Sequence, residues 1–214
     1  MLFSTGNSKI DPFQQKVIEV GIRTYAIGNV IGDGEDYLVG LKNEDLVIYT
    51  ISEELTEVYR KDYSHLKPWK VSIGDVDGDG IDDISIGVYK ESPLHPVMAK
   101  RPFIYSFRDG QMQPKWRGSR LSRPFVDYNF YDLDGDGIDE LISIEILEDG
   151  RNLINSYKWK GFGFEGFMES EDFQEINSLD KRGDGIFINT KEGREEFIGK
   201  LVLSEDKIIV ERVR

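Results

Sequence analysis

The residues Asp75-Val76-Asp77-Gly78-Asp79-Gly80-Ile81-Asp82-Asp83 recur almost intact as Asp132-Leu133-Asp134-Gly135-Asp136-Gly137-Ile138-Asp139-Glu140. Each copy holds five carboxylates, and charges at that density repel one another unless a cation neutralises them. Carboxylates at the first, third, fifth and ninth positions, with the seventh carbonyl, match the all-oxygen shell of calcium. The alternative interpretation, a solvated acidic turn, explains neither the spacing nor the repetition.

The sequence therefore predicts two calcium sites. Their expected ligands are the side chains of Asp75, Asp77, Asp79 and Asp83 with the carbonyl of Ile81, and the side chains of Asp132, Asp134, Asp136 and Glu140 with the carbonyl of Ile138. An EF-hand fits poorly, because Ile86 and Ser143 stand where that motif has its bidentate glutamate. Apolar residues alternate on both sides of the first loop and before the second, so we expect each ion between two strands.

Two degraded copies of the loop lie at residues 27–36 and 180–186. Ile31 and Tyr37 replace the acids at positions three and nine of the first, and Arg182 and Ile188 replace those of the last. A cation site has no place for an arginine ligand, so we expect both of these turns to be free of metal. The four loops recur about 45 to 60 residues apart, a spacing typical of repeat architectures.

Each repeat offers four runs with the length and composition of strands. The runs are 24–27, 37–41, 46–51 and 55–60; 69–73, 84–89, 103–107 and 111–116; 125–131, 141–147, 153–159 and 162–168; and 175–179, 186–189, 197–203 and 208–213. Four short strands per repeat predict an all-β fold of propeller type.

Residues 69–90 and 125–147 resemble FG-GAP/VCBS repeats, the calcium-loop blades also found in the integrin α-chain head. The first copy carries the motif nearly complete over residues 73–84, whereas the second has Tyr131 in place of the motif's glycine and Glu140 as its last ligand. The resemblance implies a β-propeller, with calcium in hairpin loops at one end.

We therefore expect residues 1–214 to form a single β-propeller domain with blades at about 24–61, 69–117, 125–168 and 175–213. A four-bladed ring is favoured; the alternative is part of a larger propeller, since family propellers usually have seven blades. Residues 1–23, with a possible strand at Lys16-Val17-Ile18-Glu19-Val20, are expected to close the ring against the last blade.

A second functional candidate is the basic stretch 100–123, which has seven Lys and Arg residues against one acid, Asp109. Its candidate ligand-binding residues are Arg101, Arg108, Trp116, Arg117, Arg120 and Arg123. Arginines beside aromatic rings are suited to acidic glycans or to an acidic protein partner. The competing interpretation is that they pair with the chain's own acids and protect strand edges.

Composition limits the classes of partner and location. The net charge of −13 opposes nucleic acid and anionic membranes as partners, and the absence of cysteine excludes disulfides and thiolate metal sites. No stretch approaches about 18 apolar residues and residues 1–13 have no signal pattern, so we expect no membrane insertion. Loops of this kind need calcium at about 10⁻⁴–10⁻³ M, which favours an extracytoplasmic or secreted protein.

The expected function is a calcium-stabilised binding module for a protein or a surface glycan. The alternative is an extracellular polysaccharide hydrolase or lyase with acids at the mouth of the ring. The chain has two histidines, His65 and His95, in loops, and it has no nucleophile elbow or phosphate-binding loop. The oligomeric state is left open.

Overall fold

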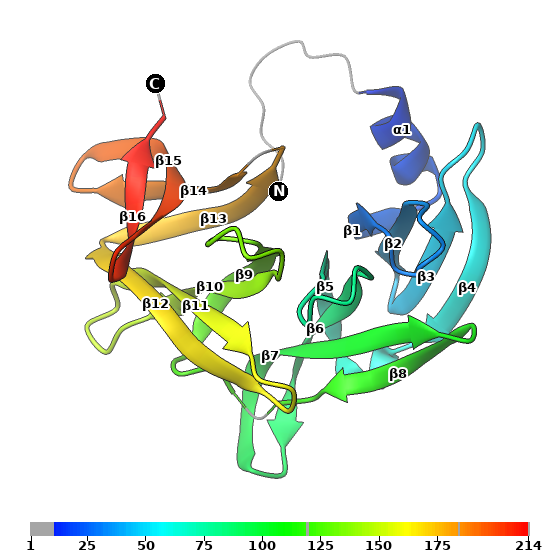
Figure 1. The fold of residues 1–214 in the computed structure, drawn as a ribbon, viewed down its shortest axis with the longest axis horizontal. Helices are drawn as coiled ribbons and strands as arrows, with labels where there is room; N and C mark the ends of the chain where they lie inside the picture. Colours follow the sequence, from blue (N-terminus) through cyan, green and yellow to red (C-terminus); the bar gives the residue numbers. More distant parts are fainter. Residues whose placement is uncertain (1–10, 119, 184, 214) are drawn as a thin grey trace.

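The computed structural model describes residues 11–118, 120–183 and 185–213, which contain mostly strands joined by tight turns (Figure 1). The elements are α1 (Pro12–Glu19), β1 (Ile22–Gly28), β2 (Tyr37–Lys42), β3 (Asp45–Thr50), β4 (Thr56–Asp62), the short 3₁₀ helix η1 (Ser64–Leu66), β5 (Pro68–Gly74), β6 (Asp83–Ser92), β7 (His95–Arg108), β8 (Gln111–Trp116), β9 (Phe125–Tyr131), β10 (Glu140–Ile146), β11 (Asn152–Trp159), β12 (Phe164–Phe173), β13 (Glu175–Arg182), β14 (Gly185–Glu192), β15 (Glu195–Ser204) and β16 (Lys207–Arg212).

The expected all-β class is confirmed, and each of the predicted runs coincides with a strand. β1 to β4 and β5 to β8 form two separate sheets in which consecutive strands pair antiparallel. Such meanders arise because alternating side chains give each strand one apolar face, while turn residues reverse the chain after it.

The expected four-bladed propeller is wrong, and so is its alternative of a partial propeller built from separate four-stranded blades. β12 pairs in parallel with β16 through Ser170 and Ile208, and this pairing joins the last two repeats into one sheet of eight strands. The described residues thus form sheets of four, four and eight strands. Outer strands carry unpaired backbone groups, and the β12–β16 pairing covers two such edges at once.

The eight-stranded sheet curls into a near-barrel. Its two edge strands, β9 and β13, contact each other. Ile142 and Ile154 from one half of the sheet pack against Ile188 and Leu201 from the other half. The curl therefore encloses an apolar core of its own.

Two further clusters of core residues lie between sheets. Leu41 and Ile48 of the first sheet share a cluster with Ile73 and Ile86 of the second. A further cluster contains Val76, Ile104, Tyr128, Phe130 and Leu141, which joins the second sheet to the eight-stranded one. As a result β1, β5, β9 and β13 lie in succession around the middle of the molecule (Figure 1).

The possible strand at residues 16–20 is wrong, because residues 12–19 form helix α1. Pro12 stands in the first turn, where its fixed φ and missing N–H cost nothing. The helix packs on the first sheet, with Val17 buried and the ring of Phe13 6.3 Å from that of Tyr25. It lies away from β14–β16 (Figure 1), so it does not close the molecule against the last repeat. Residues 1–10 of the expected closing segment lie outside the described residues.

Candidate metal centres and pockets

The two acidic loops, residues 75–83 and 132–140, connect β5 to β6 and β9 to β10. The hairpins are closed by the pairs Gly74–Asp83 and Tyr131–Glu140, so the ninth-position acid of each loop begins the second strand. The expected placement of both loops in hairpin connections, with no flanking helix, is confirmed.

The first aspartate of each loop organises the turn. The carboxylate of Asp75 accepts the backbone N–H groups of Gly78, Asp79 and Gly80 at 2.8, 3.1 and 2.7 Å. Asp132 accepts the three equivalent N–H groups of its own loop at 2.7 to 3.1 Å. Gly78 and Gly80 have φ of 74° and 81°, in the left-handed region that a glycine adopts without strain.

Three carboxylates converge in each loop. One oxygen from each of Asp75, Asp77 and Asp79 lies within 4.8 Å of the others, and the same holds for Asp132, Asp134 and Asp136. Each triplet could therefore hold a metal ion, and its negative charges repel one another when none is neutralised.

A lysine ammonium already approaches the converging acids of loop 75–83. Lys115 Nζ of β8 lies 2.6 Å from Asp77 and 2.7 Å from Asp83, and Arg108 of β7 lies 2.5 Å from Asp79. The third, fifth and ninth positions of the loop are therefore paired within the chain.

Loop 132–140 is paired by Lys158 of β11. Its Nζ lies 2.5 Å from Asp134, 2.6 Å from Asp136 and 3.3 Å from Glu140. These ion pairs hold the pKa of Lys158 above its usual value, and the lysine lowers the pKa of Asp136. One ammonium thus bridges three of the predicted calcium ligands.

The ninth-position acids are buried, unlike most of the other predicted ligands. Glu140 is 0% exposed, and burial raises its pKa to about 7. Its Oε2 accepts the N–H of Leu133 at 2.9 Å, whereas Oε1 accepts no hydrogen bond from the described residues and forms an ion pair with Lys158. In the first loop, burial likewise raises the pKa of Asp83, which accepts a hydrogen bond from Ser106. A buried carboxylate is stable only beside a cation or several donors.

The eighth-position aspartates do not join the converging acids, but tie neighbouring repeats together. Asp82 exchanges two hydrogen bonds of 2.9 Å with the backbone of Asn29, and the N–H of Asp139 donates to Asp75 at 2.8 Å. A Cβ at Gly74 would lie 2.7 Å from the Asp139 carboxylate, so that position requires glycine. Tyr131 replaces this glycine in the third repeat, where the next loop has no aspartate at position eight.

The predicted carbonyl ligands belong to half-buried isoleucines whose side chains also join the repeats. A Cβ placed on Gly32 would lie 2.5 Å from the side chain of Ile81, and one on Gly78 would lie 3.0 Å from that of Ile138. Each isoleucine therefore packs over the loop of the preceding repeat.

The two degraded loops, residues 27–36 and 180–186, keep features of the turn, but other side chains replace some of the acids. Asn29 accepts the N–H of Gly32 at 2.9 Å, as the first-position aspartates do. The hydroxyl of Tyr37, at position nine, donates to Asp33 at 2.6 Å. Arg182 pairs with Asp180 at 3.1 Å in the last loop, whose residue 184 lies outside the described residues. Here neutral or basic side chains from the chain itself contact the loop acids.

The basic stretch 100–123 does not form a single face. Arg108 pairs with Asp79 of the acidic loop, and Arg123 pairs with Glu145 and Glu169 at 3.0 and 2.8 Å. These two arginines are held by the chain's own acids.

The remaining candidates of this stretch have separate surroundings. Arg101 is fully buried, and the ring of Trp116 packs edge-on against Phe164 at 5.1 Å. Arg117 and Arg120 are exposed, and neither forms an ion pair or a hydrogen bond with the described residues. Of the predicted ligand-binding residues, Arg120 and Arg123 line one pocket.

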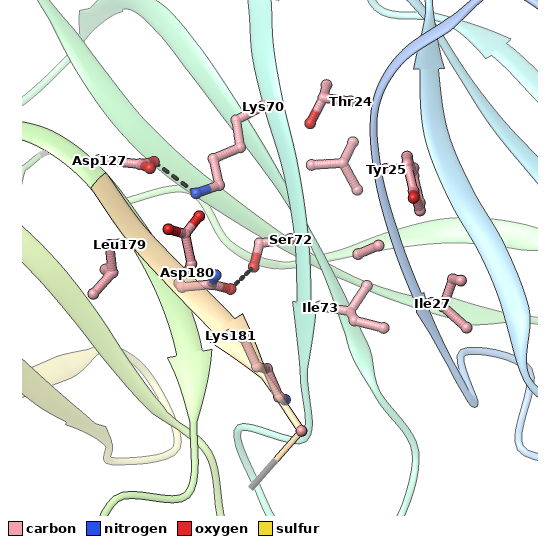
Figure 2. Close-up of a pocket in the computed structure, with 14 residues that line it drawn as sticks. Thr24, Tyr25, Ile27, Lys70, Ser72, Ile73, Asp127, Leu179, Asp180 and Lys181 are labelled. Atoms are coloured by element: carbon pink, nitrogen blue, oxygen red, sulfur yellow. Dashed lines mark hydrogen bonds and ion pairs between the residues drawn. The ribbon is translucent and has the colours of Figure 1, made fainter. Parts of the chain in front are cut away.

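A polar pocket of about 510 Å³ lies in the middle of the molecule, lined by β1, β5, β9 and β13 (Figure 2). Lys70 Nζ bonds Asp127 there at 2.6 Å, and Ser72 donates to Asn129 at 2.6 Å. Tyr25 lies on the opposite wall. Hydroxyl, amide and charged groups beside an aromatic ring are suited to a polar ligand.

No family model matches this chain, and no curated protein matches it either. The resemblance to FG-GAP/VCBS repeats therefore stays a prediction from the loop motif. Among the described residues, no helix has the length and apolar character needed to cross a membrane.

Proposed function

We propose that this protein is a calcium-stabilised binding module, with one calcium ion in each of the loops 75–83 and 132–140. The observation that carries the proposal is the convergence on Lys158. Asp134, Asp136 and the buried Glu140 approach one positive charge, and Oε1 of Glu140 accepts no hydrogen bond from the described part of the chain. All the candidate metal ligands are oxygen atoms. Calcium prefers oxygen ligands, whereas softer metals prefer nitrogen or sulfur.

The lysines would leave the loops when calcium binds. A lysine offers one charge on a flexible stem, whereas a calcium ion takes six to eight oxygens around two charges. Asp82 and Asp139 of these loops also form the hydrogen bonds that join each loop to the loop of the preceding repeat. An ion that makes one loop rigid would therefore also stabilise the neighbouring repeat. Calcium at ~10-fold excess over its Kd adds roughly 1.4 kcal/mol per site.

The binding role is supported by the central pocket, whose polar lining suits a surface glycan or a polar segment of a protein partner. An extracytoplasmic address follows from the calcium requirement, since loops of this class fill at about 10⁻⁴–10⁻³ M.

Thermal unfolding in EDTA and in a calcium titration tests the metal sites. The midpoint is expected to rise with calcium concentration, by about 3–6 °C per site at ~10-fold excess of calcium over its Kd. Asp77→Asn and Asp134→Asn should each remove one part of the rise. Asp206→Asn, an exposed acid in the turn between β15 and β16, is the matched control and should keep the full response. A midpoint that does not move with calcium would overturn the proposal.

A further inference from the structure

A second pocket lies between the hairpin of β6 and β7 and the segment 120–125. The hairpin extends away from the rest of its sheet (Figure 1). Its volume is about 430 Å³, within the range of small-molecule sites. One wall is the hairpin, with Tyr89, Val97 and Met98, and the other is the segment with Leu121, Pro124 and Phe125. The pocket is thus mainly apolar.

Three cations line this pocket and no acid does: Lys100, Arg120 and Arg123. Arg123 is neutralised by Glu145 and Glu169, but Arg120 is exposed and forms no ion pair with the described residues. Lys100 donates to the carbonyl of Val126 and lies 4.4 Å from the ring centre of Trp69. It forms no ion pair with the described residues, although the negative charge of Asp127 acts on it. In a chain of net charge −13, the local charge is positive.

Arg101 places a buried positive charge next to the hairpin wall of the pocket, because it contacts His95 and Val97 of that wall. It is 0% exposed and donates to the carbonyls of Lys90, His95 and Val97 at 2.8 to 3.0 Å. Its Nη1 has no hydrogen-bond partner, and no carboxylate pairs with it among the described residues. A buried guanidinium without an anion is costly, and a negative charge nearby lowers that cost.

We propose that this pocket binds a small organic carboxylate with an apolar body, such as a medium-chain alkanoate. The carboxylate lies at the Arg120 and Lys100 side, where neither cation forms an ion pair with the described residues, and the apolar body lies between Val97, Met98 and Phe125. The charge of Arg101 favours the anionic end without touching it. The site is separate from the calcium loops.

Calorimetric titration with decanoate, below its micelle concentration and in EDTA, tests the proposal without the calcium sites. Saturable binding to one site is expected, with decan-1-ol about tenfold weaker or more, because it lacks the charge-assisted hydrogen bonds. Arg120→Glu should weaken decanoate binding by at least about tenfold, and Val97→Asp should do the same. Val97 is 53% exposed and Arg120 is also exposed, so both variants should still fold.

Matched controls separate the pocket from general charge and hydrophobicity. Arg194→Glu removes an exposed arginine of the turn between β14 and β15, outside the pocket, and Leu94→Asp changes the tip of the same hairpin, where Leu94 is 89% exposed. Both should leave the Kd unchanged. Equal affinity for decanoate and decan-1-ol, or a Kd that Arg120→Glu and Val97→Asp leave as it is, would overturn the proposal.

Discussion

Lys115 and Lys158 give each acidic loop a cation from the chain itself. In the second loop the lysine bridges Asp134, Asp136 and the buried Glu140. An internal ammonium neutralises part of the loop's negative charge when no ion is bound. If the proposed calcium ion binds, it has to displace this ammonium from the same oxygens, so its affinity would be the difference between the two pairings.

Replacement of Lys158 by methionine tests both effects of the lysine, the neutralisation of the loop acids and the competition with calcium. Lys158→Met should lower the free energy of unfolding in EDTA by about 1–3 kcal/mol, because Glu140 keeps its burial and loses its cation. The same variant should bind calcium more tightly, since the ion no longer displaces the lysine. Denaturant titration in EDTA and calorimetry with calcium measure both changes.

Lys160→Met is the control for that prediction, because Lys160 is exposed and lies two residues further along the chain. It should change neither quantity. If Lys158→Met weakened calcium binding instead, the ammonium would be supporting the loop geometry rather than competing with the ion.

At helix α1, the local sequence pattern led to a wrong prediction of a strand. Lys16-Val17-Ile18-Glu19-Val20 contains β-branched residues and was expected as a strand. Yet Phe13, Val17 and Val20 have the three-to-four-residue spacing of one helix face, and Pro12 is typical of a first turn. The contact of that face with the first sheet decides in favour of the helix.

The packing of α1 can be tested with two neighbouring residues. Val17 is 2% exposed, so Val17→Ala should lower the free energy of unfolding by about 1–3 kcal/mol through lost apolar contact. Ile18 is 58% exposed on the other face, and Ile18→Ala should cost less than about 0.5 kcal/mol. Urea unfolding of both variants makes the comparison. Equal losses would mean that the helix does not pack on the sheet by its Val17 face.

The strands of the described residues were predictable because their signals are local. Period-two apolar patterns and glycine-containing turns act within a few residues, so the runs at 69–73 and 84–89 could be recognised without any partner. The loops between strands were predictable for the same reason. The lysines that pair with the loops were not, since Lys115 and Lys158 are distant in sequence from the acids they contact.

At the scale of the whole molecule, the last two repeats form one structural unit. The pair Ser170–Ile208 joins them, and Ile142 and Ile154 share a core with Ile176 and Ile188. Neither repeat covers its apolar face alone, so the two should unfold together.

Hydrogen exchange can test this joint unfolding. Ile188→Ala, in β14, should cost about 2–4 kcal/mol and speed amide exchange in β10 and β11 as much as in β14. Exchange in β2 and β3 should change less, because those strands belong to another sheet and core. Faster exchange confined to β13–β16 would contradict a shared unit.

The sequence by itself determined the all-β class, the strands and the two acidic hairpin loops, because strand periodicity and turn chemistry depend on neighbours in the chain. The tertiary structure alone decided the sheets of four, four and eight strands, the helix α1, the lysines inside the acidic loops and the dispersal of the basic stretch. Each of these depends on contacts between residues far apart in sequence. Their energies come from burial and charge pairing in the folded molecule, which no local pattern contains.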